Sequence, residues 1–100
     1  MKDTLRHRVL ICYDIRDPKR LRRAHRTLLG YGDPLQYSVF LCHLSRAERV
    51  LMEMALREII NLAEDTVHIV DLGPAVGLAG QRIRAMGRAR LPTVPRSRII

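Results

Sequence analysis

The sequence predicts an open α+β sandwich, in which two helices cover one face of an antiparallel sheet. Three observations support this fold class. Apolar, strand-like segments alternate with amphipathic, helix-like segments along the chain, and each helix lies between strands. The chain has 100 residues with 47% hydrophobic content, which suffices for one modest core. We therefore expect one domain over residues 1–80, followed by an edge strand and tail over residues 81–100.

The first predicted strand spans Val9–Ile15, where a β-branched and apolar run indicates burial on both faces. Side chains alternate between the two faces of a strand, so Asp14 shares a face with Leu10 and Cys12. The strand is therefore expected to end in a carboxylate on one face of the sheet.

The first predicted helix begins at Asp17 and Pro18 and runs to about Gly30, because Asp is a good N-cap and Pro fits the first helical position. One side of this helix carries an expected core stripe, formed by Leu21, Ala24, His25 and Leu28. The opposite side is cationic and carries Lys19, Arg22, Arg23 and Arg26.

The second half of the domain is expected to contain another helix and further strands. Leu35–Leu44 is rich in strand-forming residues, and its pattern leaves open whether it forms one bent strand or two. Ser45 and Glu48 have the spacing of a capping box and predict a helix to about Ala63. Its expected apolar face consists of Val50, Leu51, Met54, Ala55, Ile59 and Leu62. A last strand of the domain is predicted over Thr66–Leu72.

The predicted sheet has a second face that the chain's own helices leave uncovered, because right-handed crossovers place both helices on one side. Both faces of the first strand are largely apolar, so this second face needs a cover. A second copy packed sheet against sheet is the simplest one, with the C-terminal tail and its candidate edge strand over Arg82–Met86 docking on the mate. In such a homodimer, Asp14 would lie near its symmetry mate.

The formal net charge of +8 is distributed unevenly. Lys and Arg outnumber acids by nine to three in residues 1–30 and by six to none in residues 73–100, whereas acids outnumber them by seven to three in residues 31–72. This segregation predicts nucleic acid as a partner. The contact candidates are Lys19, Arg20, Arg22, Arg23 and Arg26.

Other patterns exclude several classes of protein. No apolar run approaches the roughly 20 residues that span a bilayer, and neither a signal sequence nor a Cys-x-x-Cys pair is present. We therefore expect a cytoplasmic protein without membrane contact. The histidines lack the spacing of metal ligands. The aromatic residues Tyr31, Tyr37 and Phe40 are too few to predict a base-stacking platform.

Asp14 has two interpretations that the sequence leaves open. Two such carboxylates facing each other across a dimer would favour a hard divalent cation such as Mg²⁺, which could activate water against a phosphodiester. Alternatively, Asp14 caps the loop before the first helix. Asp17 is better explained as the helix cap, although it could also support a metal-bound Asp14.

Four short motifs follow one another in a specific order and spacing: Tyr13-Asp14-Ile15, Asp17 with Lys19-Arg20, Tyr31-Gly32, and Gln36-Tyr37-Ser38-Val39-Phe40. In this combination, the segment from about Val9 to Leu72 resembles the CRISPR-associated protein-two endoribonucleases. One departure is Pro34, which stands where many members have a basic residue, so the phosphate contact of that residue is expected to be missing here.

The resemblance implies a ferredoxin-like homodimer that joins the CRISPR integrase and holds double-stranded DNA during spacer acquisition, as part of antiviral defence. It implies that Asp14 is the catalytic metal ligand, shared with the dimer mate, in a metal-dependent endonuclease acting on RNA, including single-stranded RNA, or DNA. Tyr13, Asp17 and Ser38 are the residues expected to support this site. Two alternatives stay open: a related toxin-type ribonuclease outside any CRISPR locus, and a structural nucleic-acid-binding dimer without catalysis.

Overall fold

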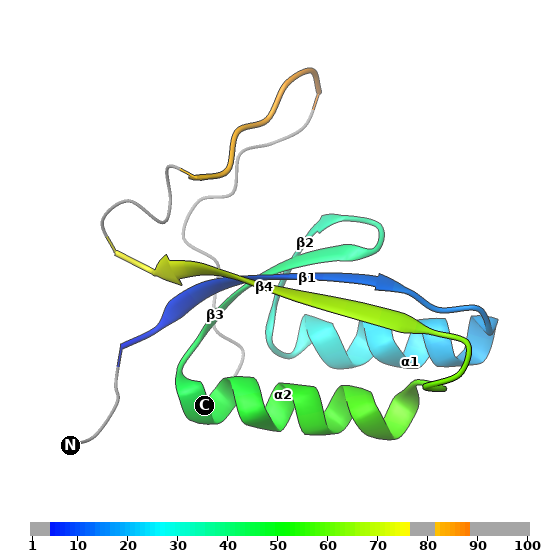
Figure 1. Cartoon of the computed structure of the whole chain (residues 1–100). Coiled ribbons are helices and arrows are strands. Elements are labelled where there is room, and N and C mark those ends of the chain that lie inside the picture. The colour runs from blue at the N-terminus through cyan, green and yellow to red at the C-terminus, as the bar shows by residue number, and fades with distance from the viewer. Residues whose placement is uncertain (1–4, 77–81, 89–100) are drawn as a thin grey trace.

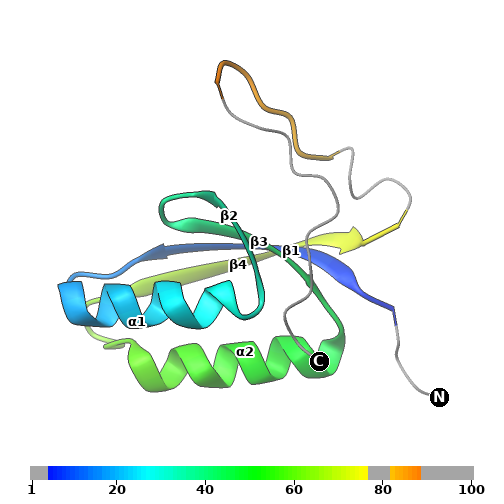
Figure 2. The ribbon, with the colours of Figure 1, turned by 180° about the vertical axis from the view of Figure 1, so that it is seen from behind.

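The computed structural model describes residues 5–76 and 82–88. Six elements follow one another along the chain: β1 His7–Asp14, α1 Pro18–Leu29, β2 Gly32–Gln36, β3 Val39–Leu44, α2 Arg46–Ile59 and β4 Thr66–Pro74. The strands form one antiparallel sheet in the order β2-β3-β1-β4. Both helices lie on the same side of this sheet (Figures 1 and 2), so the predicted α+β sandwich is confirmed.

The hydrophobic core lies between the sheet and the two helices. In β1, alternate residues point into it, and Val9, Ile11 and Tyr13 are buried, as the strand periodicity requires. The helices contribute Ala24 and Leu28 from α1 and Met52, Leu56 and Ile59 from α2. The central strands β1 and β3 therefore form the layer on which the rest of the fold is built.

The segment whose strand count the sequence left open forms two strands, β2 and β3, joined by a turn at Tyr37 and Ser38. Tyr13 of β1 donates its backbone N–H to the Ser38 carbonyl oxygen at 3.1 Å, which fixes this turn against the sheet. Gly32 is needed at the start of β2, because a Cβ there would lie 2.5 Å from the Leu41 carbonyl oxygen. The hairpin thus forms without a Gly or Pro in its turn.

The helix α2 differs from the prediction in its length and in its buried face. It ends at Ile59 rather than near Ala63, because the chain turns at Asn61, whose backbone N–H donates to the Asp65 carboxylate at 2.8 Å. The predicted apolar face was wrong in part, since four of its residues are more than half exposed: Val50, Leu51, Met54 and Leu62. The helix instead buries Met52, Leu56 and Ile59, which are spaced four and three residues apart.

Residues 82–88 contain no strand, although the sequence predicted a short edge strand over Arg82–Met86. Such a strand needs a partner edge for its backbone hydrogen bonds, and here Arg82 instead donates its side chain to the Leu72 carbonyl oxygen at 3.0 Å. The rest of the predicted tail lies outside the described residues. Among the residues that the structure describes, no helix has the length and apolar character required to cross a membrane.

Candidate nucleic-acid interface and metal site

Asp14 is the last residue of β1, and its side chain is exposed. It lies in register with Thr66 of β4, on the face of the sheet opposite the helices, because Tyr13 and Ile15 on either side of it point into the core. Within residues 5–76 and 82–88, no group donates a hydrogen bond to this carboxylate or forms an ion pair with it. The Asp14 carboxylate is therefore available to a ligand.

The loop between β1 and α1 is held by other acidic residues. Asp17 is the N-cap of α1 and accepts a hydrogen bond from the Arg20 backbone N–H at 2.9 Å, which confirms its predicted role. Asp65 accepts from the Arg16 backbone N–H at 2.9 Å. Asp17 thus caps α1 and Asp65 accepts from the loop, whereas no described backbone N–H donates to Asp14, so the capping interpretation of Asp14 finds no support among the described residues.

An exposed carboxylate without a partner fits a magnesium ion, which commonly binds one or two carboxylates and keeps several of its water ligands. The residues that the structure describes contain no cluster of three or more His, Cys, Asp or Glu side chains that could hold a metal. Among the described residues of one chain, Asp14 is an exposed carboxylate on this face of the sheet that could hold such an ion together with its water ligands.

Tyr13 and Ser38 support the end of β1 without facing the Asp14 side chain. The Tyr13 hydroxyl lies on the helix side of the sheet, 3.3 Å from His25 Nδ1, and donates to the Tyr37 carbonyl oxygen at 3.3 Å. Burial raises the pKa of Tyr13, and the nearby Tyr37 adds to this effect. Ser38 contributes its backbone carbonyl. Tyr13 thus anchors the strand end from the helix side of the sheet, and Ser38 holds it through the backbone.

The predicted cationic face of α1 is exposed, and its four residues are Lys19, Arg22, Arg23 and Arg26. In the described part of the chain, none of the four pairs with an acidic side chain. Arg20 differs, because its Nε donates to Asp65 Oδ2 at 2.9 Å and its Nη2 lies 3.0 Å from Glu64 Oε1. Arg20 therefore joins α1 to the segment before β4, and its guanidinium is already paired with two carboxylates.

Asp65 is a structural residue that the sequence pattern did not reveal. Its side chain is buried and accepts hydrogen bonds from Arg20, from the Asn61 backbone N–H and from the Arg16 backbone N–H. The Arg20 guanidinium holds the pKa of Asp65 well below its usual range, and the two backbone donors lower it further. The only sequence signal was an acidic residue placed directly before a strand, where it can satisfy a turn.

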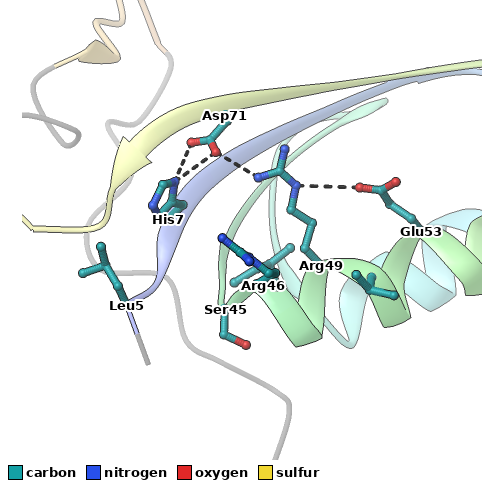
Figure 3. Close-up of a pocket in the computed structure, with 9 residues that line it drawn as sticks. Leu5, His7, Ser45, Arg46, Arg49, Glu53 and Asp71 are labelled. Carbon is teal, nitrogen blue, oxygen red and sulfur yellow. Dashed lines mark hydrogen bonds and ion pairs between the residues drawn. The ribbon is translucent and has the colours of Figure 1, made fainter. Parts of the chain in front are cut away.

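A second polar cluster connects β1, β4 and α2 around a cavity of about 300 Å³ (Figure 3). Asp71 lies at its centre, 2.9 Å from His7 Nδ1 and 2.9 Å from Arg49 Nη1. Desolvation alone would raise the pKa of Asp71, but hydrogen bonds from the Gly73 backbone, His7 and Arg49 outweigh it and hold the pKa at about 2. Asp71 is paired with His7 and Arg49 within the cluster. We therefore interpret the cluster as a structural contact that holds the edge strand β4 against α2.

A comparison with protein families matches residues 7–75 to the family described as CRISPR associated protein Cas2. This chain belongs to the Cas2 family. The match begins at β1 and extends through β4, so it includes the strand that ends in Asp14 and the cationic helix α1. The resemblance found in the sequence motifs is thereby confirmed.

Individual members of the Cas2 family agree with this assignment. A protein from Geobacter sulfurreducens named CRISPR-associated endoribonuclease Cas2 is 40% identical, and the alignment covers 96% of this chain and 100% of that protein. A second protein with this name, from Rhodospirillum rubrum, is 41% identical over 83% of this chain and 80% of its own length.

Solved structures show the same fold. The crystal structure of Cas2 from Streptococcus pyogenes superposes with a TM-score of 0.67 at 31% identity, covering 80% of this chain and 99% of that one. A hypothetical protein from Thermus thermophilus gives a TM-score of 0.74 at 26% identity, with 88% of this chain and 99% of that chain covered. The sandwich described above is therefore the fold of Cas2 proteins.

Proposed function

We propose that this chain acts in CRISPR adaptation as a homodimer that binds double-stranded DNA and serves as a scaffold for the integrase during spacer acquisition. We further propose that it is an endonuclease that cleaves RNA or DNA with a divalent cation such as Mg²⁺. The exposed, unpartnered Asp14 carboxylate at the end of β1 is the observation that carries the proposal. Relatives named CRISPR-associated endoribonuclease support the same activity.

The ion, when bound, would supply positive charge to a phosphodiester and lower the pKa of a bound water. The part of this chain is to hold that ion with the Asp14 carboxylate. The backbone on both sides of Asp14 is fixed, by the Tyr13 N–H bond to Ser38 and the Arg16 N–H bond to Asp65. A carboxylate on such a fixed strand end needs little reorganisation to bind a metal.

The proposed homodimer is supported by the face of the sheet on which Asp14 lies. That face also carries Leu10, Cys12 and Val70, and Val70 is 43% exposed. Burying apolar surface against a second copy stabilises the assembly by roughly 25 cal/mol per Å². In this arrangement residues 1–80 form the packed domain, residues 81–100 dock on the mate, and the two Asp14 side chains approach each other across the dimer.

The test is a nuclease assay with labelled single-stranded RNA and double-stranded DNA, in Mg²⁺ and in a chelator, comparing the unaltered protein with Asp14→Asn. We expect cleavage only in Mg²⁺, and a loss of about a hundredfold or more in Asp14→Asn, because the neutral amide is a much weaker ligand for a hard cation. Glu58→Gln is the matched control, since Glu58 is an exposed carboxylate on α2, a helix that packs on the face of the sheet opposite Asp14.

A second experiment separates the scaffold role from the catalytic role. It measures DNA binding and spacer uptake by Asp14→Asn. If the scaffold role is right, this variant retains both while cleavage is lost. Cleavage at the original rate by Asp14→Asn would overturn the catalytic role and indicate a contaminating nuclease. Loss of DNA binding together with cleavage would overturn the scaffold role.

A further inference from the structure

A cavity of about 330 Å³ lies beside α1 on the helix side of the sheet, whereas the Asp14 side chain is on the other face. One wall is formed by α1, and the other side carries Tyr13 of β1 and Tyr37 of the β2–β3 turn. The turn and α1 lie at the same end of the sheet in both views (Figures 1 and 2). The cavity is therefore built from three elements that are separate in the sequence.

Two side chains that line this cavity, those of Tyr13 and His25, are held in place by the buried Phe40. Tyr13 stacks on Phe40 with ring centroids 6.3 Å apart, and His25 meets Phe40 edge-on at 5.2 Å. The Tyr13 hydroxyl contacts both His25 Nδ1 and the Tyr37 carbonyl oxygen at 3.3 Å. In contrast, the Tyr37 residue is 75% exposed at the mouth, although its backbone is held by this bond. An exposed ring on a fixed backbone is suited to stacking.

The rim of the cavity is cationic. Arg22 and Arg26 both line it and are one helical turn apart on α1, so their guanidinium groups lie along the same edge. No acidic side chain in residues 5–76 or 82–88 pairs with either of them. By comparison, Arg20 and Arg49 form ion pairs with Asp65 and Asp71. The two rim arginines therefore remain available for an anion.

We propose that this cavity binds the base of an unpaired nucleotide, which stacks on Tyr37 while Arg22 and Arg26 hold the adjoining phosphates. The flat base of a nucleotide matches the apolar lining of the cavity, and its phosphates match the cationic rim. Paired bases in a duplex do not expose their faces, so the site selects single-stranded segments. This inference rests on the proposed nucleic-acid binding and adds to it a mode of recognition.

This site is not visible in the linear sequence, because the aromatic residues are too few and too scattered to predict a stacking platform. The platform expected for such recognition has aromatic side chains side by side on central strands. Here the group is assembled by the fold, from β1, α1 and the β2–β3 turn. It offers one exposed ring and therefore room for one base.

The test measures the affinity of the full chain for a labelled single-stranded oligonucleotide and for a blunt duplex of the same length. Tyr37→Ala is expected to weaken single-strand binding about tenfold and to leave duplex binding unchanged, because base stacking is lost. Tyr37→Phe should retain the affinity, since it keeps the ring. Leu62→Ala is the matched control, as it also removes an exposed apolar side chain, 71% exposed and outside this cavity.

A second probe is the same single strand with its bases replaced by abasic sites. It should bind about tenfold more weakly to the unaltered protein and equally to Tyr37→Ala, because the two changes remove the same contact. If Tyr37→Ala binds the intact single strand as tightly as the unaltered protein does, the base site is overturned. Duplex binding by both proteins would then leave the proposed function standing. Failure of the unaltered protein to bind either probe would overturn both.

Discussion

At the scale of single residues, Asp14 and Asp65 have opposite surroundings. Asp14 precedes the loop between β1 and α1, and Asp65 contacts the same loop through Arg16. Asp65 is buried and accepts hydrogen bonds from Arg20 and from two backbone N–H groups, which leaves it no capacity for a ligand. Asp14 is exposed and, within the described residues, without a partner. A buried carboxylate without such partners would be costly, so Asp65 serves stability, and Asp14 is the one suited to bind a cation.

Replacement of Asp65 by Asn should lower the thermal unfolding midpoint by several degrees at pH 7, because it removes the buried carboxylate that pairs with Arg20 and leaves this guanidinium only the exposed Glu64. The pKa of Asp65 is lower in the folded than in the unfolded chain, where it is about 3.9, so its contribution is complete above that value and is lost as the pH falls further. The unaltered protein should therefore lose stability more steeply than Asp65→Asn below about pH 4. Circular dichroism melts from pH 7 to pH 2 measure this difference.

Glu64→Gln is the matched control for this prediction, since Glu64 contacts the same Arg20 but has a side chain that is 56% exposed. An exposed ion pair contributes little, so this variant should unfold close to the unaltered protein. Parallel pH curves for Asp65→Asn and the unaltered protein would contradict the structural role of Asp65.

At the scale of elements, α1 serves three purposes with three sets of side chains. Ala24 and Leu28 are buried against the sheet, and Arg20 ties the helix to the segment before β4. The remaining exposed side carries Lys19, Arg22, Arg23 and Arg26. Successive side chains on a helix are rotated by 100°, so these three sets of residues lie on different faces of α1. The cationic face can therefore be altered without disturbing the core.

Charge removal on α1 should change the salt dependence of duplex binding. Each of Arg22→Gln, Arg23→Gln and Arg26→Gln is expected to reduce the slope of log affinity against log salt concentration by about one, because one phosphate contact and its released counterion are lost. Affinity titrations at several salt concentrations give the slope. Arg57→Gln is the matched control, being an exposed arginine on α2. Unchanged slopes in all three α1 variants would refute this contact surface.

The elements also show how far the sequence could predict the fold. The bounds of α1 were predictable because Asp17 and Pro18 mark its start and its polar and apolar faces contrast. The buried face of α2 was not, because apolar residues occur nearly all around it and more than one stripe is compatible with helical spacing. Only contact with the sheet selects Met52, Leu56 and Ile59.

The candidate site was predictable to a similar degree. Asp14 could be singled out because a carboxylate at the end of an apolar strand is unusual by itself. The role of Arg20 could not, because its partner Asp65 is 45 residues away in the sequence and only the tertiary fold brings them together. For the same reason, the aromatic cavity beside α1 was not visible in a linear pattern.

At the scale of the whole molecule, the arrangement of the layers supports the proposed dimer. Both helices cover one face of the sheet (Figures 1 and 2), and the opposite face carries apolar side chains together with Asp14. An apolar sheet face without a helix layer is a surface that a second copy can cover. The proposed metal site and the proposed dimer are therefore linked, since the same face serves both.

The introduction of a charge at Val70 should separate the proposed dimer. We expect light scattering after size-exclusion chromatography to give twice the chain mass for the unaltered protein and one chain mass for Val70→Glu, because an unpaired carboxylate in an apolar interface is strongly disfavoured. Val76→Glu is the matched control, since Val76 is 72% exposed and lies beyond the end of β4. The control should remain a dimer.

The same link predicts how the metal affects assembly. Two Asp14 carboxylates close together repel each other, so Mg²⁺ should shift the dimerisation equilibrium toward the dimer, and Asp14→Asn should dimerise well without the ion. Sedimentation equilibrium with and without Mg²⁺ separates these cases. If Mg²⁺ shifts the dimerisation of both proteins equally, the two Asp14 carboxylates do not lie close together. If the unaltered protein stays monomeric at every concentration, the proposal of a shared metal site is wrong.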